Sequence, residues 1–586
     1  MKKAGRILFP VIFVLILFPI WGKMVFGRSH AKYIDGSEQQ LNALFLSALK
    51  LDDSGASSGE INTPIDADGI IVALFSKDEN DKSPIMAGGK AEGIGGETLI
   101  ALIDEIGKKS QKIDDFTPGP LTLHLIIDAS KVRFPFSKDI FSGYQSGLTG
   151  IMYCENHDCR ALPAPLIHAR GMSYDKAVKN LKNGAGALID GLDKSDGIYL
   201  FKDFGILLGE KTRSLYRASV PLRNPSSKDI IDACRIAGDF LVRIQRSNGS
   251  WYYEYRADKD KLNSKSYNIL RHAGTTYSLF QLYGVTEDKR YANSANRGLR
   301  YLEQSIEADP EDPKRLYVRE GKNIKLGGAG LSLMAYVEKE KHSGTSDGEK
   351  KTMEGLARHL MLAQNADGSF ESYHALPGKK AKKRRSIYYP GEAMVGLIRY
   401  YQIRPERKDC LDTVVKAANY LVDKRWNMLG LRFNIPPDAW LMLALEELHE
   451  VTGNDSYAQY CFDIAEGMGF DQWIGIYPQY DFYGGYFPVT PQVTPAGARS
   501  EGLTAAWLIA KRLDDRKMLE KLTNIIRRSA SFQISCLIRE PFSYLYANPQ
   551  RALGVFRHSP VSNKTRIDYN QHNISGLLVA AKILDS

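Results

Sequence analysis

The sequence predicts a mainly α-helical protein. Its larger part is an (α/α)6 toroid of six inner and six outer helices, preceded by a small α/β domain and an N-terminal transmembrane anchor. Three observations lead to this prediction. From position 226 onward, apolar residues recur with helical spacing in twelve segments. These segments alternate between two compositions, and their connections alternate between short and long. Such self-similarity along a chain is the sequence pattern of a repeat architecture.

The first 27 residues form the predicted anchor. Lys2, Lys3 and Arg6 precede an apolar run over 7–21, which extends to 26 if Lys23 reaches the membrane interface. This order is typical of a secretion signal or a signal anchor, and the run can span a bilayer. We expect an uncleaved anchor, with cleavage at the small residues near 29–31 as the alternative. Because positive charge stays inside, the bulk of the chain is expected in the periplasm, on a single-pass span in a bacterial inner membrane.

Residues 28–225 form the predicted α/β domain. The expected elements are strands over 69–75 and 121–127, a helix over 98–108, a hairpin over 150–163 and a strand pair over 198–208. Cys154 and Cys159 lie in the hairpin, and outside the cytoplasm a disulfide between them is plausible. A metal site that also uses His157 is the less favoured alternative, because no second ligand pair is evident.

The net charge of +10 favours polyanionic neighbours, which include anionic glycans, phospholipid surfaces and nucleic acid. Nucleic acid is the least favoured of these, because the sequence has neither zinc-finger spacing nor the aromatic and basic signature of ribonucleoprotein domains. No metal and no cofactor is expected.

Residues 226–586 form the predicted toroid. Ser227 caps a first helix over 228–245, five helix pairs follow, and a last helix over 569–584 completes the ring beside the first. The first members of the pairs are expected at 269–283, 327–339, 390–401, 438–451 and 499–513. Their partners are expected at 289–306, 348–364, 408–426, 456–468 and 516–534.

The two kinds of helix differ in composition. The first members open with small residues and are apolar around most of their circumference, so they are expected to be buried as the inner ring. Their partners carry Lys, Arg and Glu on one face, as outer helices do. Inner-to-outer connections are short, as at 514–515, whereas outer-to-inner connections are long, as at 469–498. All long loops therefore emerge on one face, and long loops usually serve binding or catalysis.

The inner helices begin on that face with many polar side chains, which a ring would direct toward one cavity. The candidate site residues are Tyr267, Arg271, His272, Tyr388, Tyr389, Glu392, Asp438, Trp440, Arg499, Glu501, Arg566, Asp568, Gln571 and His572. Buried charge is expensive unless it is paired or functional. Together these residues predict a ligand site.

Two chemistries fit this set. Glycoside hydrolysis needs two carboxyl groups, for which the candidates are Glu392, Asp438, Glu501 and Asp568. Epimerisation or β-elimination at a uronic acid needs a Tyr or His base and cations that hold the carboxylate. Those residues would be Tyr267, His272, Tyr389, His572, Arg271, Arg499 and Arg566.

Each residue also has a structural interpretation. Asp438 follows two prolines and could cap its helix. Arg499 with Glu501, and Arg566 with Asp568, could form structural ion pairs. His272 and His572 could be hydrogen-bonded core histidines, which is the commoner state of a lone histidine.

The alternating helices resemble the six-hairpin (α/α)6 superfamily of glycosidases, polysaccharide lyases, sugar epimerases and terpene cyclases. The stretches 245–251 (QRSNGSW) and 364–370 (QNADGSF) are similar to the Q-W repeat of terpene cyclases, but the acidic D-x-D-D motif is absent. We therefore interpret both as toroid turns after an outer helix. The stretches 267–274 (YNILRHAG), 388–393 (YYPGEA) and 566–572 (RIDYNQH) resemble bacterial relatives of glucuronyl C5-epimerases and glycoside hydrolases.

The resemblance implies an extracytoplasmic, carbohydrate-active protein that acts on a cell-envelope or extracellular polysaccharide, neutral or anionic. A glycoside hydrolase is the first expectation. A uronic acid C5-epimerase or polysaccharide lyase is the alternative. A non-catalytic glycan-binding or assembly protein on the same fold is the third.

Overall fold

The computed structural model describes residues 67–76, 84–90, 96–113, 118–132, 145–192, 194–208, 213–263, 265–375, 385–429, 436–474, 480–486 and 490–585. The predicted anchor at 1–27 lies outside the described residues. Among the residues that are described, no helix has both the length and the apolar character needed to cross a membrane. The chain divides into two compact units, with the main boundary between Val220 and Pro221.

The N-terminal unit is built on one sheet with the strand order β3-β1-β2-β6-β5-β4-β7-β8, and β7 also pairs with β3. Seven of the strands therefore close into a ring. The strands are β1 (Gly69–Ser76), β2 (Ile85–Lys90), β3 (Pro118–Lys131), β4 (Thr149–Glu155), β5 (Asp158–Leu162), β6 (Ala187–Asp190), β7 (Gly197–Leu208) and β8 (Arg213–Leu215). The helices are α3 (Gly96–Ser110), α4 (Ala164–Ala169) and α5 (Tyr174–Lys182).

Both faces of β1 are buried. Ile70 and Val72 pack with Leu102 and Ile106 of α3, whereas Ile71 packs in a second core with Phe201. The predicted strands, helix and hairpin are present, but the strand pair predicted over 198–208 is wrong, because β7 runs through it without a turn.

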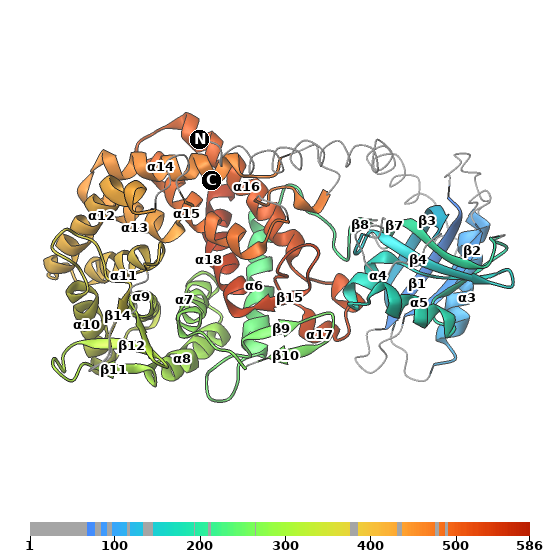
Figure 1. Cartoon of the computed structure of the whole chain (residues 1–586), viewed down its shortest axis with the longest axis horizontal. Coiled ribbons are helices and arrows are strands. Elements are labelled where there is room, and N and C mark those ends of the chain that lie inside the picture. Colours follow the sequence, from blue (N-terminus) through green and yellow to red (C-terminus); the bar gives the residue numbers. More distant parts are fainter. Residues whose placement is uncertain are drawn as a thin grey trace, which may run out of the picture. The chain divides into compact units, whose positions relative to one another are not determined.

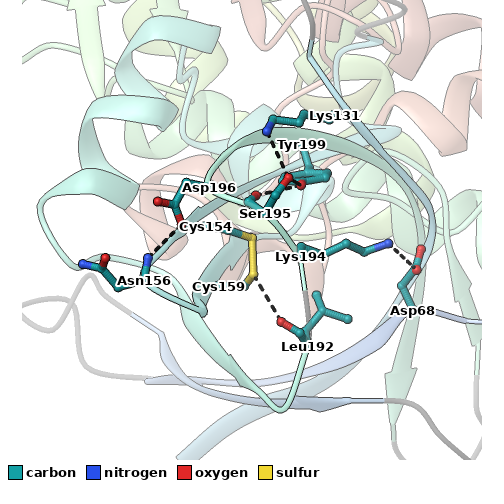
Figure 2. Close-up of a disulfide and its surroundings, with 10 residues drawn as sticks. All are labelled: Asp68, Lys131, Cys154, Asn156, Cys159, Leu192, Lys194, Ser195, Asp196 and Tyr199. Carbon is teal, nitrogen blue, oxygen red and sulfur yellow. Dashed lines mark hydrogen bonds and ion pairs between the residues drawn. A yellow bond between two sulfur atoms is a disulfide. The ribbon is translucent and has the colours of Figure 1, made fainter.

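The disulfide plausible from the sequence joins Cys154 and Cys159, whose Cα atoms are 4.1 Å apart at the start of the β4–β5 hairpin (Figure 2). Beyond it, the Asn156 amide donates to Asp196, and Lys194 pairs with Asp68 at 3.0 Å. The cross-link closes the hairpin next to its turn, and the Asn156–Asp196 bond ties that turn to the loop just before β7.

The described residues of the second unit form twelve long helices, as predicted. The inner helices are α7 (Ile269–Thr286), α9 (Leu326–Ser343), α11 (Tyr389–Ile403), α13 (Ala439–Thr452), α15 (Val493–Arg512) and α18 (Ile567–Asp585). The outer helices are α6 (Ser227–Arg243), α8 (Lys289–Glu303), α10 (Asp347–Leu362), α12 (Lys408–Leu429), α14 (Asp455–Phe470) and α16 (Arg516–Cys536). Figure 1 shows α6, in green, beside α18, in red.

The inner helices form a closed ring. Helix α7 packs on α9, α9 on α11, α11 on α13, α13 on α15, α15 on α18, and α18 packs back on α7. Glycines permit this close approach. A Cβ on Gly391 would lie 2.6 Å from the Leu441 backbone nitrogen, and a Cβ on Gly502 would lie 3.1 Å from the Ala439 Cα. The small residues that marked the inner helices in the sequence are therefore their contact points.

The connections confirm the predicted asymmetry. Two to four residues join inner helices to the outer helices that follow them, whereas longer loops lead from outer to inner helices. Two small sheets order these loops. One has the order β10-β9-β15, from β9 (Glu254–Arg256), β10 (Lys261–Asn263) and β15 (Lys564–Arg566). The other contains β11 (Ile306–Ala308), β12 (Leu316–Glu320), β13 (Asn323–Lys325) and β14 (Tyr373–His374). Short helices η1 (Tyr480–Phe482), η2 (Phe542–Leu545) and α17 (Pro549–Ala552) complete them.

A glutamine clamp recurs where three outer helices end. The side-chain amide of Gln245 donates to Gly249 O at 3.0 Å in its own loop and to Ser294 O at 2.9 Å in α8. Gln364 and Gln472 repeat this pattern on α12 and α16. Each clamp ties a loop to the neighbouring outer helix, so the loops that frame the inner-helix N-termini are anchored.

Candidate functional site

Glu392 and Asp438 lie at the N-terminal ends of the adjacent inner helices α11 and α13. Both are buried, at 6% and 1% exposure. Asp438 caps α13 and accepts the Leu441 amide at 3.2 Å, as its capping interpretation predicted. Glu392 is in the first turn of α11, and its Oε2 has no hydrogen-bond partner among the described residues.

The electrostatic state of Glu392 follows from this placement. Burial, then the negative charge of Asp438, raises the pKa of Glu392 to about 8, against a smaller opposing effect of Lys325. Lys325 is itself paired with Glu320. Gly327 of α9 makes room for the carboxyl, because a Cβ there would lie 1.7 Å from Glu392 Oε2. Glu392 therefore holds its proton at neutral pH beside a second carboxyl group.

Glu501 of α15 and His572 of α18 form a second pair. Their Oε2 and Nδ1 atoms are 2.8 Å apart. Burial alone would lower the pKa of His572, but the charge of Glu501 and the hydrogen bond to it outweigh burial and raise that pKa. The Trp440 ring lies 5.8 Å from the imidazole, and Gln571 Nε2 lies 3.3 Å from its Nδ1. Glu501 thus orients a histidine that can carry a proton.

Asp568 is enclosed by two guanidinium groups. Arg566 binds it through two hydrogen bonds of 2.8 Å, and Arg271 Nε lies 3.2 Å from Oδ2. Arg271 also donates to the Tyr253 hydroxyl. This arrangement confirms the predicted Arg566–Asp568 pair. A carboxylate held in this way is poorly suited to act as a nucleophile or a base.

Tyr267 and His272 form a hydrogen-bonded network that joins the loop before α7 to α7 and α8. The His272 Nε2 lies 2.8 Å from Gly298 O, so it must donate, and Nδ1 then accepts from the Tyr267 hydroxyl at 2.7 Å. The same hydroxyl accepts the Trp251 amide at 3.1 Å. Burial lowers the pKa of His272 to about 4. His272 is therefore a neutral core histidine with both nitrogens engaged.

The remaining candidates are two tyrosines and one arginine. Tyr388 is the N-cap residue of α11 and is 45% exposed, and its carbonyl accepts the Glu392 amide at 3.0 Å. Tyr389 packs with its ring centroid 5.8 Å from that of Tyr373. Arg499 does not pair with Glu501. Its only ion pair among the described residues is a 3.9 Å contact with Asp471.

A buried ion cluster farther along the inner helices was missed by the sequence reasoning. Arg399 donates to Glu447 at 2.6 Å and to the Tyr277 hydroxyl at 2.6 Å, and it interacts with Glu338. These residues lie mid-helix or near helix C-termini, away from the long loops. The sequence did carry a signal for this cluster: several neighbouring inner helices each have a charged residue within an otherwise apolar stretch.

Among the described residues, no group of three or more His, Cys, Asp or Glu side chains could hold a metal ion.

No protein-family model matches the chain, and no curated protein matches it. Several solved structures are similar in shape. A D-mannose isomerase is 12% identical, with a TM-score of 0.47 over 61% of this chain and 97% of that one. A family 76 glycoside hydrolase from a bovine Bacteroides thetaiotaomicron strain is 11% identical, with a TM-score of 0.45 over 80% and 97%. An unsaturated glucuronyl hydrolase specific for heparin is 12% identical, with a TM-score of 0.45 over 61% and 98%. At these scores the similarities carry no argument, and the toroid assignment stands on the ring contacts themselves.

Proposed function

We propose that the chain is a carbohydrate-active enzyme, a glycoside hydrolase in which Glu392 is the general acid and Asp438 is the second carboxyl group. The observation that carries this proposal is the Glu392 carboxyl, which is protonated beside Asp438 and whose Oε2 has no hydrogen-bond partner among the described residues. Glycoside hydrolysis needs one carboxylic acid to protonate the leaving oxygen and one carboxylate to act as base or nucleophile. The acid and the base of such a pair are recognised by environments that keep one carboxyl group protonated and the other ionised.

The surrounding residues give the proposal its geometry. The long loops lie around the N-termini of the inner helices, and Tyr388 exposes aromatic surface at the start of α11, whereas Trp440 is buried beside Asp438. Aromatic faces pack well against the apolar faces of sugar rings. Contacts made away from the glycosidic bond can therefore hold the sugar in place while the two carboxyl groups act on that bond.

The test is a reducing-end assay of the full chain in detergent against neutral and acidic polysaccharides. Glu392→Gln and Asp438→Asn should each lower kcat by about 100-fold or more, the usual contribution of a general acid or base. Glu466→Gln on outer helix α14, an exposed side chain paired with Lys521, is the control and should retain activity. Full activity in both site variants would refute the assignment.

A second candidate function is favoured by the Glu501–His572 pair. A histidine whose proton is stabilised by a neighbouring carboxylate could exchange protons at a sugar carbon, as a uronic acid C5-epimerase or a lyase requires. An epimerase would bring solvent deuterium to C5 without new reducing ends, whereas a lyase would give an unsaturated product that absorbs in the ultraviolet, together with the reducing end that elimination releases. Either signal, lost in His572→Gln but kept in Glu392→Gln, would favour this function over hydrolysis.

The location of the enzyme is part of the proposal. The basic and apolar segment at 1–27 supports an inner-membrane anchor with the ring in the periplasm, where cell-envelope polysaccharide is accessible. Removal of residues 1–27 should release the protein from the membrane fraction. Continued membrane association would show that another part of the chain holds it there.

A further inference from the structure

Arg499 is a buried cation with unusually little compensation. Its side chain is 13% exposed, yet it makes no hydrogen bond within the described part of the chain, and its Nε is buried without a partner. Its contacts there are the Tyr486 ring, 4.8 Å from the guanidinium carbon, and the 3.9 Å approach to Asp471. A guanidinium carries five N–H donors, and burying it without acceptors costs free energy.

Arg399 shows what a compensated arginine looks like in the same ring. It is equally buried, but it donates to Glu447 and to the Tyr277 hydroxyl at 2.6 Å each. Burial lowers the pKa of Arg499, whereas the anionic neighbours of Arg399 more than offset burial and raise the pKa there. The difference is that Arg399 has its acceptors among the described residues, whereas those residues offer Arg499 only the distant Asp471 carboxylate.

The position of Arg499 connects it to the two carboxyl groups. It lies less than one helical turn before Gly502, which contacts Ala439 at the start of α13, the helix that Asp438 caps. It also interacts electrostatically with Tyr388, whose carbonyl receives the Glu392 amide. Arg499 therefore lies toward the loop-side end of the inner helices, within electrostatic range of Tyr388, which precedes the helix that carries the candidate acid.

We propose that Arg499 is the receptor for an oxyanion on the substrate, so that the glycan bound here is acidic. This inference rests on the proposed function and adds the substrate class. The planar fork of arginine matches a carboxylate or a sulfate oxygen pair through two parallel hydrogen bonds. Asp471 leaves the region close to neutral, which favours a monoanion, a uronic acid carboxylate or a sulfate ester, over a dianionic phosphate.

Binding to matched ligands tests the proposal directly. Titration calorimetry of the full chain in detergent would use trisaccharides of galacturonate, mannuronate and glucuronate, their methyl esters, and a sulfated galactan trisaccharide. At least one acid should bind about 10-fold or more tightly than its ester, because charge-assisted hydrogen bonds are lost on esterification. The sulfated probe tells whether the site accepts a carboxylate alone or either monoanion.

Variants assign any preference to this residue. Arg499→Gln should abolish the preference for acid over ester, and Arg499→Lys should keep only part of it, because a lysine lacks the fork. The control is Arg512→Gln at the opposite end of α15, where the arginine is paired with Glu446 at 2.5 Å, and it should keep the full preference. Equal binding of acid and ester by the wild type, or a preference that survives Arg499→Gln, would overturn the proposal.

A ligand-free measurement gives an independent check. Arg499→Met removes an uncompensated charge and should raise the melting temperature by roughly 2 °C or more, whereas Arg399→Met strands Glu447 and should lower it. If both variants lower the melting temperature equally, Arg499 has a structural role and the proposal fails. Hydrolysis of neutral glycans with no acid preference would leave the proposed function intact while refuting this inference. If no probe binds and no polysaccharide is cleaved, both the proposed function and this inference are refuted.

Discussion

Replacement of Glu392 by glutamine should stabilise the protein, and increasingly so as the pH rises. The folded protein keeps the Glu392 proton up to about pH 8, whereas the unfolded chain loses it above its ordinary pKa of 4.5. Between these values the unfolded state binds fewer protons than the folded state, so the free energy of unfolding falls as the pH rises. Glutamine is neutral at every pH and has nearly the shape of glutamic acid. The free energy of unfolding of the variant should therefore not fall with rising pH for this reason.

The magnitude follows from the two pKa values. The difference between about 8 and 4.5 corresponds to roughly 5 kcal/mol when fully developed. By proton linkage, the free energy of unfolding of Glu392→Gln should exceed that of the wild type by roughly 1 kcal/mol at pH 5 and by roughly 4 kcal/mol at pH 8. A side chain only 6% exposed justifies using the full pKa difference, with solvent screening neglected.

The assay is urea denaturation at pH 5, 6.5 and 8, followed by tryptophan fluorescence, since Trp251 and Trp440 both lie in the ring unit. Glu466→Gln, on the exposed surface of α14, is the control and should show no pH-dependent gain. The reasoning is refuted if Glu392→Gln and the wild type lose stability in parallel between pH 5 and pH 8. That result would mean that the Glu392 carboxyl is ionised in the folded protein and cannot serve as the acid.

Three further predictions test other parts of the structure. Gly327→Ala places a methyl group on the general-acid carboxyl and should lower kcat by about 100-fold, whereas Gly348→Ala, whose nearest neighbour is 3.9 Å away, should leave kcat unchanged; equal activity of the two variants would contradict the predicted contact. Glu501→Gln should lower the pKa of His572, which Glu501 raises, and an NMR titration of the imidazole would detect the change; an unchanged titration would mean that the pair does not form. The Cys154–Cys159 disulfide closes only a short loop, so its reduction should lower the free energy of unfolding of the N-terminal unit by roughly 2 kcal/mol. This loss should appear as earlier unfolding of that unit alone; a loss of ring stability of the same size would contradict the prediction.

The ring was predictable because its signals are local. Helical periodicity, small residues at inner-helix starts and unequal loop lengths are each visible within a short stretch of sequence. Helix α15 begins at Val493 rather than at Arg499 because Pro495 is tolerated in the first turn, where backbone N–H groups have no helical partner. Gly497, which lies within the connection predicted over 469–498, is part of α15 and approaches the backbone of Asn573 in α18.

Partners distant in sequence could not be predicted. A strand pair, and so a turn, was predicted within 198–208, but Asp203 is buried in β7, where it pairs with His124 and accepts the Ala164 amide. The closed seven-stranded sheet depends on the β3–β7 pairing, which no short stretch of sequence shows.

The same limit applies to the candidate site. Arg499 and Glu501 were one possible ion pair, but residues two apart on a helix face different directions. Glu501 instead finds His572 on another helix. Arg566 and Asp568 do pair, because Arg566 ends the extended strand β15 and is not on the helix that carries Asp568, so helical spacing does not separate the two side chains.

The junction between α6 and α18 has a consequence for biosynthesis. Asn570 donates to Ala237 O across a sequence separation of 333 residues, and β15 pairs with β9 over a similar span. During translation the earlier hairpins can form as they leave the ribosome, but they remain an open arc with an unsealed apolar edge until α18 arrives. Because α18 also carries Asp568 and His572, closure of the arc and completion of the site are a single event. A chain interrupted before that helix would expose apolar surface and lack the complete site, which would make it a target for proteases.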